Sequence, residues 1–339
     1  MSTSSNKNSR FFILFILSMS IIMAYMYLTR ATHTIYLGAW TEGLWEPKTN
    51  VLHPEALQLF EEHIGKKVTI AHIYRGWHEL DSDNFITELQ TIDRYSWVPM
   101  VSANPYYFDQ CKHTRYSLYK SIERGDCDAF LRNISIRFRT YGKPLFFRFA
   151  WEMNIPSNEW SLQYTGSTAQ EFVGAWRHIH TIMNEENVTN VQWVFCPQVN
   201  TPTSIAYEEI FPGDEYVDWV GLDGYNWGTT QSWSSWQNFS DVFGSSYDEL
   251  VKLAPGKPVM IAEFGTTDQG GDKPGWFSAA LNTQIPQRFP EVKALIFYNE
   301  DRSQEEQSNW KIDSPPQTLK SIQQGLKDSR YVSDFSQYK

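Results

Sequence analysis

The fold is decided by two stretches of sequence, 144-PLFFRFAWEMN-154 and 258-PVMIAEFG-265. Each contains a short apolar run, which is typical of a strand buried in a parallel sheet. A carboxylate, Glu152 or Glu263, directly follows each run among aromatic neighbours. A buried carboxylate is costly unless it is paired or has a chemical use. We therefore expect these two strands to end at one functional face.

Six similar runs occur elsewhere in the chain, and segments with helical periodicity separate them. The expected strands are Thr34–Ala39, Val68–Tyr74, Trp97–Ser102, Pro144–Ala150, Val191–Phe195, Val217–Leu222, Pro258–Ala262 and Lys293–Tyr298. The expected helices are Pro54–Ile64, Asn84–Arg94, Ala129–Tyr141, Thr168–Asn187, Ser204–Ile210, Ser240–Leu253, Trp276–Arg288 and Gln317–Leu326. Thr168 and Glu171 have capping-box spacing, and Gly142 and Gly325 stand where helix ends favour a left-handed residue.

Eight strand-then-helix units predict a (β/α)8 barrel, a TIM barrel, over residues 34–326. The alternative is a doubly wound open sheet, which usually has a glycine-rich phosphate turn after its first strand. The corresponding segment here, Gly38-Ala-Trp40, lacks that pattern. The barrel is therefore the expected fold, and its catalytic residues should lie at the C-terminal ends of the strands.

An uncharged apolar stretch, residues 11–28, precedes the barrel and is long enough to cross a bilayer as one transmembrane helix. Lys7 and Arg10 before it predict a cytoplasmic tail over residues 1–10 and a membrane-anchored, extracytoplasmic body. The alternative is a secreted protein whose signal peptide is cleaved near Thr29 and Ala31.

Composition and cysteine spacing limit the possible functions. The chain has 339 residues and a formal net charge of −10, so it lacks the clustered cations that nucleic-acid binding needs. Cys111 and Cys127 flank an expected surface loop and are candidates for a disulfide; three buried free thiols, with Cys196, are the alternative. The histidine and cysteine spacings predict no metal site, and we expect no cofactor.

The two carboxylates have the residue types that glycoside hydrolysis uses. In retaining enzymes, one acid with a raised pKa protonates the leaving oxygen and an ionised carboxylate about 5 to 5.5 Å away attacks the sugar. Aromatic residues make up 16% of the chain, and such side chains provide flat surfaces for sugar rings. The alternative for either carboxylate alone is a structural ion pair, such as Glu152 with Arg148.

The motifs Arg148-x-x-Trp151-Glu152-Met153-Asn154 and Ala262-Glu263-Phe264-Gly265 resemble those of glycoside hydrolase family 26. The resemblance implies a retaining, endo-type β-glycanase with Glu152 as acid/base and Glu263 as nucleophile. It also implies that the tyrosine of Asp223-Gly-Tyr225-Asn-Trp227 contacts the nucleophile. Family members that act on β-mannan usually have histidine before the acid/base, where this chain has Trp151. The resemblance therefore implies the retaining mechanism without implying mannan as the substrate.

Further residues after strand ends are candidates to bind the substrate, although core packing is the alternative for each. Together with the motif residues, the expected substrate-binding set is Arg148, Trp151, Asn154, Tyr225, Trp227, His72, Trp77, Tyr298 and Trp310. The expected substrate is a polysaccharide, either a mannan or an exopolysaccharide at the cell surface. Proteins of polysaccharide synthesis or export are candidate partners. The alternative function is an inactive, glycan-binding barrel in such an assembly or export system.

Overall fold

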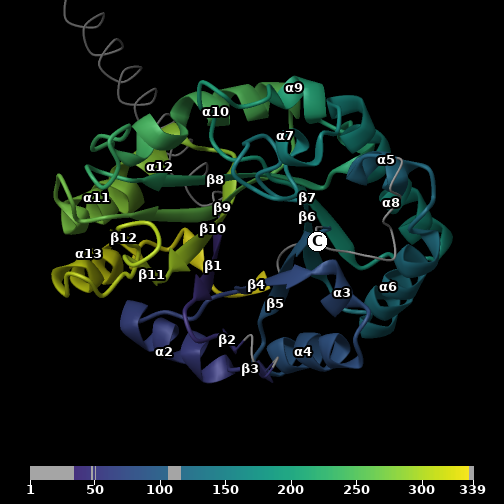
Figure 1. The fold of residues 1–339 in the computed structure, drawn as a ribbon. Coiled ribbons are helices and arrows are strands. Elements are labelled where there is room, and N and C mark those ends of the chain that lie inside the picture. Colours follow the sequence, from purple (N-terminus) through teal and green to yellow (C-terminus); the bar gives the residue numbers. More distant parts are fainter. Residues whose placement is uncertain (1–33, 47–48, 50, 106–115, 336–339) are drawn as a thin grey trace, which may run out of the picture.

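The structure is a computed structural model that describes residues 34–46, 49, 51–105 and 116–335, and its centre is a closed barrel of eight parallel strands (Figure 1). Strand β10 pairs with β1, from Tyr36 opposite Ala294 to Thr41 opposite Asn299, and this pairing closes the ring. The strands are β1 (Ile35–Thr41), β4 (Ile70–Gly76), β5 (Val98–Asn104), β6 (Leu145–Phe149), β7 (Val191–Phe195), β8 (Trp219–Asn226), β9 (Val259–Thr266) and β10 (Val292–Asn299). All eight predicted strands are present, so the expected barrel is confirmed.

Helices surround the barrel (Figure 1). The principal ones are α2 (Pro54–Ile64), α4 (Asp83–Arg94), α6 (Asp128–Tyr141), α8 (Ala169–Glu185), α9 (Tyr207–Ile210), α10 (Phe239–Leu253), α11 (Lys273–Ala279) and α13 (Gln317–Gly325). A π-helical turn, η3 (Ala280–Gln284), joins α11 to α12 (Ile285–Arg288). Shorter elements lie in the loops: α3 (Trp77–Leu80), α5 (Leu118–Glu123), α7 (Leu162–Thr165), η2 (Asp214–Tyr216), and the hairpins of β2 (Trp45–Glu46) with β3 (Val51–Leu52) and β11 (Asp301–Arg302) with β12 (Ser308–Asn309).

Two of the three predicted helix signals are confirmed. Thr168 and Glu171 form the expected capping box at the start of α8. Gly142 ends α6 in the left-handed region, with φ 66°. Gly325 does not: it is the last residue of α13 and is followed by the right-handed Leu326. Glycine is needed there for space, because an added Cβ would lie 2.7 Å from Cβ of Leu281.

Apolar side chains form two separate cores. The inner core fills the barrel below the mouth and includes Phe146, Trp219 and Met260. The outer core lies between the strands and the surrounding helices, and it includes Trp176 and Phe264. Side chains alternate between the two cores along each strand, as the pleat of a strand requires.

The chain returns to the bottom of the barrel after its last helix. Strand β13 (Tyr331–Val332) pairs with the first residues of β1, and the Phe335 ring lies 5.0 Å from Tyr36 and 5.6 Å from Phe146. Phe335 therefore covers the inner core from below. Strand β13 thus extends the paired sheet beyond residue 326, the predicted end of the barrel domain.

Two predictions fall wholly or partly outside the described residues. The expected transmembrane segment, residues 11–28, lies outside them, and no helix within the described part of the chain has the length and apolar character to span a membrane. Cys127 is disulfide-bonded and Cys196 is a buried free thiol. Cys111 lies outside the described residues, so its pairing with Cys127 stays a prediction.

Candidate active site

The two predicted catalytic carboxylates meet at the C-terminal mouth of the barrel. Oxygen atoms of Glu152, Glu263 and Asp223 all lie within 4.8 Å of one another. Glu152 follows β6, whereas Glu263 lies within β9 and Asp223 within β8. The barrel thus brings together side chains that are separated by up to 111 residues of sequence.

A β-bulge directs Glu263 into the barrel. The pairing of β8 with β9 shifts between Leu222–Ile261 and Asp223–Glu263, so Ala262 is the extra residue on β9. Met260 and Ala262 already face the inner core, and strict alternation would turn Glu263 outward. The inserted residue reverses this, which is a common use of bulges next to active sites.

Two donors hold the Glu263 carboxylate. Nη2 of Arg148 donates to Oε1, and the Tyr225 hydroxyl donates to Oε2 at 2.6 Å. Glu263 is only 5% exposed, so these bonds act with little competition from water. The contact between Tyr225 and Glu263 is the one that the family resemblance implies.

The backbone around Glu152 is strained. Glu152 has φ 53° and Ala150 has φ 46°, a region that costs non-glycine residues roughly 1 to 3 kcal/mol each. The Glu152 amide donates to the Cys196 carbonyl at 2.9 Å, and Asn158 Nδ2 donates to Oε2 at 3.1 Å. These contacts hold the carboxyl in the mouth.

Burial raises the pKa of Glu152 from 4.5 to about 7, and the negative charge of Glu263 adds to the effect. The Asn158 hydrogen bond and the Arg148 charge act in the opposite direction and are weaker. Near neutral pH, a large fraction of Glu152 therefore carries a proton. A proton donor beside an ionised carboxylate is the pairing required for glycoside hydrolysis.

Arg148 organises the floor of the site. Its Nη1 donates to both oxygens of Asp223 at 2.7 and 2.6 Å, and its Nε donates to Ser102 Oγ at 2.7 Å. Arg148 is fully buried and pairs with Asp223 and Glu263, so the alternative of a structural pair with Glu152 is not what the structure shows. Asp223 therefore fixes the guanidinium that in turn orients Glu263.

His72 also belongs to this floor. Its Nε2 lies 2.7 Å from Ser102 Oγ and 3.3 Å from Nη2 of Arg148. Burial, followed by the Arg148 charge, lowers the pKa of His72 well below its usual value. The ring is thus neutral, with Nε2 as acceptor, and it lies beneath the mouth.

Two rows of aromatic rings flank the carboxylates. The first row consists of Trp40, Tyr74, Trp151 and Trp160, with neighbouring centroids 5.0, 5.2 and 4.3 Å apart. The second row consists of Tyr298, Tyr225, Trp310, Trp227 and Trp233, with centroids 5.6, 4.9, 4.9 and 5.6 Å apart. The second row ends at Trp233, which is 71% exposed. The partly exposed members of both rows offer apolar faces to a sugar chain, whereas Trp310 is buried.

Three of the predicted substrate-binding residues, Trp77, Asn154 and Trp310, are buried and do not line the mouth of the barrel. Trp77 begins α3 and packs in the outer core against Phe130 and Phe149, so it does not face the mouth. Asn154 is buried; its Nδ2 donates to the Gln198 carbonyl, and its Oδ1 accepts from the Gln198 amide. Trp310 is 1% exposed and lies behind Tyr225 as a packing ring.

Sequence reasoning missed Tyr74 and passed over Asp223 as a site residue. Burial and the charge of Glu263 raise the pKa of the Tyr74 hydroxyl, which places it beside the nucleophile candidate. Strand alternation could have found both residues, because Tyr74 lies two positions from His72 and Asp223 two positions from Tyr225. For Asn158 the sequence contains no comparable signal, since it follows the strained turn at Glu152.

The three clustered carboxylates also offer oxygen ligands of the kind that cations prefer. Arg148 pairs with two of them, Asp223 and Glu263, so its single positive charge compensates only part of the negative charge of the cluster.

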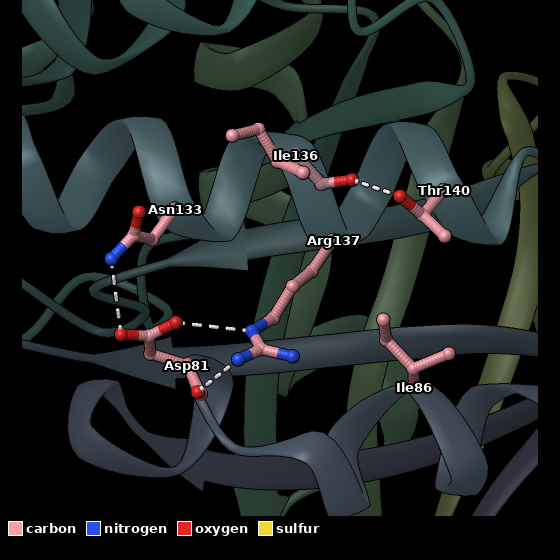
Figure 2. Close-up of a pocket in the computed structure, with 6 residues that line it drawn as sticks. All are labelled: Asp81, Ile86, Asn133, Ile136, Arg137 and Thr140. Atoms are coloured by element: carbon pink, nitrogen blue, oxygen red, sulfur yellow. Dashed lines mark hydrogen bonds and ion pairs between the residues drawn. The ribbon is translucent and has the colours of Figure 1, made fainter.

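A separate hollow lies on the outer surface between α4 and α6. It is lined by Asp81, Ile86, Asn133, Ile136, Arg137 and Thr140 (Figure 2). Arg137 and Asn133 point to Asp81 (Figure 2). Nε of Arg137 donates to Asp81 Oδ1 at 3.0 Å, and Nδ2 of Asn133 donates to Oδ2 at 3.4 Å. Its polar groups thus pair with one another, and it lies outside the barrel mouth.

Comparisons with known proteins agree with this geometry. Residues 117–284 match the model of glycosyl hydrolase family 26. The chain is 31% identical over 277 residues to Endoglucanase H of Acetivibrio thermocellus. The aligned region covers 80% of this chain and 29% of that protein. It is also 26% identical over 192 residues to a mannan endo-1,4-beta-mannosidase of Bacillus subtilis. This aligned region covers 54% of this chain and 48% of that protein. The chain therefore spans less than half the length of these two relatives.

The fold is also shared with solved structures. The catalytic domain of an endo-beta-1,4-mannanase from Bacillus sp. JAMB-750 superposes with a TM-score of 0.63 at 16% identity, covering 90% of this chain and 89% of that one. This likeness supports the barrel fold.

Proposed function

Because the chain belongs to glycosyl hydrolase family 26, we propose that it is a retaining, endo-acting β-glycanase that cleaves its substrate by double displacement. One observation carries the proposal. Glu152 and Glu263 present oxygens within 4.8 Å of each other, a separation that suits a retaining pair and leaves little room for the water of an inverting one.

In the first step, Glu263 attacks the anomeric carbon and forms a covalent glycosyl ester. Glu152 gives its proton to the departing glycosidic oxygen, and the bond between that oxygen and the anomeric carbon breaks. Arg148 and Tyr225 each donate to one oxygen of Glu263 and thereby orient it for the attack. The pKa of Glu152, raised to about 7, keeps a proton available near neutral pH.

In the second step, Glu152 acts as a base. It removes a proton from a water molecule that attacks the anomeric carbon, and the ester bond to Glu263 breaks. Both carboxylates return to their starting states. Ionisation of Glu263 disfavours ionisation of Glu152, so formation of the neutral ester favours loss of the Glu152 proton at the required moment.

The substrate is a β-linked glucan or mannan. One relative in the comparison is an endoglucanase and another is a mannan endo-1,4-beta-mannosidase. Trp151 favours the glucan, because the histidine usual in mannan-degrading members is replaced by an indole that packs between Tyr74 and Trp160. Residues 11–28 anchor the enzyme in a membrane, with the barrel outside the cytoplasm, because this apolar stretch follows Lys7 and Arg10.

The test is turnover of β-glucan, β-mannan and xylan by the full chain and by Glu263→Ala. We expect the substitution to abolish hydrolysis with unchanged circular dichroism. Glu208→Ala, which removes an exposed carboxylate on α9, is the matched control and should retain full activity. Proton NMR should show the β-anomer as the first product. An α-anomer, or activity remaining in Glu263→Ala, would contradict the proposal.

A further inference from the structure

A third carboxylate, Glu300, joins the two aromatic rows at the mouth. It directly follows β10, on the same face of the barrel as Glu152 and Glu263. Its Oε2 accepts a hydrogen bond from the Tyr298 hydroxyl and a second from Trp40 Nε1 at 3.3 Å. Trp40 is the end of the first row and Tyr298 the end of the second, so Glu300 fixes their relative position.

The other oxygen of Glu300 is free to bind a ligand. Among the described residues, no side chain or backbone group donates to Oε1, and the residue is partly exposed. Burial, followed by the negative charge of Glu300, raises the pKa of Tyr298, so this phenol stays protonated and donates. Glu300 is therefore a pre-oriented carboxylate with one oxygen anchored and one available. Ionised acceptors form stronger hydrogen bonds with hydroxyl groups than neutral ones do.

The position of Glu300 assigns it to one side of the scissile bond. Glu300 accepts a hydrogen bond from Tyr298, whose ring lies 5.6 Å from that of Tyr225, and the Tyr225 hydroxyl donates to Glu263. Glu300 thus lies on the side of the nucleophile. The sugar attacked by the nucleophile and the units joined to its non-reducing end, the glycone, occupy that side.

Resting on the proposed hydrolase function, we propose that Glu300 is a specificity-determining residue for the glycone. Its Oε1 accepts a hydrogen bond from a hydroxyl of a sugar unit whose ring stacks on Trp40. The combination of an aromatic face and an anchored carboxylate suits a sugar unit that stacks on Trp40 and donates a hydroxyl to Glu300.

The experiment measures binding separately from turnover. Cellotetraose and mannotetraose are titrated calorimetrically into the full-length Glu263→Ala variant and into the same variant with Glu300→Gln or Glu300→Ala added. We expect Glu300→Ala to weaken the Kd of the bound oligosaccharide at least tenfold. Glu300→Gln keeps an amide oxygen for Tyr298 and Trp40 but loses the charge, so its effect should be intermediate. Glu305→Ala, an exposed carboxylate on the same loop, should leave Kd unchanged.

The outcomes separate the two proposals. A Kd within twofold of the parent for both Glu300 variants overturns the role of Glu300, even if the wild-type chain hydrolyses glycans. A loss of affinity without any turnover by the wild-type chain supports Glu300 as a sugar-binding residue and contradicts the hydrolase proposal. Absence of binding of both oligosaccharides by the Glu263→Ala parent overturns the glycone site.

Discussion

The raised pKa of Glu152 predicts a cost in stability that can be measured without any substrate. A carboxyl with pKa 4.5 in the unfolded chain and about 7 in the native barrel binds more protons when folded across that interval. Stability therefore falls as pH rises from 4.5 to 7, by about 1.4 kcal/mol per pH unit for one full proton. Integrated over the interval, this gives an upper limit of about 3 kcal/mol. Because Glu152 is partly exposed, solvent screening reduces the expected value to about 2 kcal/mol.

The perturbation is Glu152→Gln, which removes the titration and nearly preserves the shape of the side chain. Urea unfolding of the wild type and the variant at pH 5 and pH 8 gives four free energies. From pH 5 to pH 8, we expect the free energy of unfolding of the variant to rise by about 2 kcal/mol relative to that of the wild type. The slope of this free energy against urea concentration should change little. For the surface control Glu208→Gln, the free energy of unfolding should not change relative to the wild type between the two pH values. A relative gain below about 0.5 kcal/mol for Glu152→Gln would refute the reasoning.

The remaining predictions concern rate and packing. If Glu152 must be protonated to act, kcat/KM should fall about tenfold per pH unit above pH about 7, and a profile that is flat to pH 9 would contradict the assignment. Tyr225→Phe removes a hydrogen bond to the ionised nucleophile, so kcat/KM should drop roughly 10- to 100-fold in initial-rate assays; a change below twofold would exclude the role. Gly325→Ala should destabilise by about 1 to 3 kcal/mol because of the clash with Leu281, measured by urea unfolding. Gly244→Ala, in an open position of α10, should stabilise by about 0.5 to 1 kcal/mol, and equal effects of the two alanines would contradict the packing argument.

The barrel could be predicted because its strands are short apolar runs separated by helices with clear periodicity. The proximity of Glu152 and Glu263 could be predicted because each directly follows or ends an apolar strand, and the C-terminal ends of parallel barrel strands meet at one face. The contact of Tyr225 with Glu263 came from family resemblance and is confirmed by the structure.

Other features depend on local backbone geometry that periodicity does not encode. The bulge at Ala262 turns Glu263 inward, and left-handed residues at Ala150 and Glu152 shape the turn after β6. Trp40 lies near the end of β1, and Trp77 directly follows β4. Trp77 nevertheless packs in the outer core, because α3 begins at this residue. A tryptophan at a strand end looks the same in either position. The contact of Glu300 with Trp40 depends on the pairing of β10 with β1, which closes the barrel and joins residues 260 positions apart in the sequence.

The pairing of β13 with β1 has a consequence for how the barrel is presented. Residue 34, where the described chain enters β1, and Phe335, near its end, both lie at the N-terminal ends of the strands. Glu152 and Glu263 lie at the opposite end. If residues 11–28 anchor the chain as proposed, the anchor precedes the end of the barrel opposite Glu152 and Glu263. Long polymers could then reach the carboxylates from the surroundings without crowding against the lipid surface.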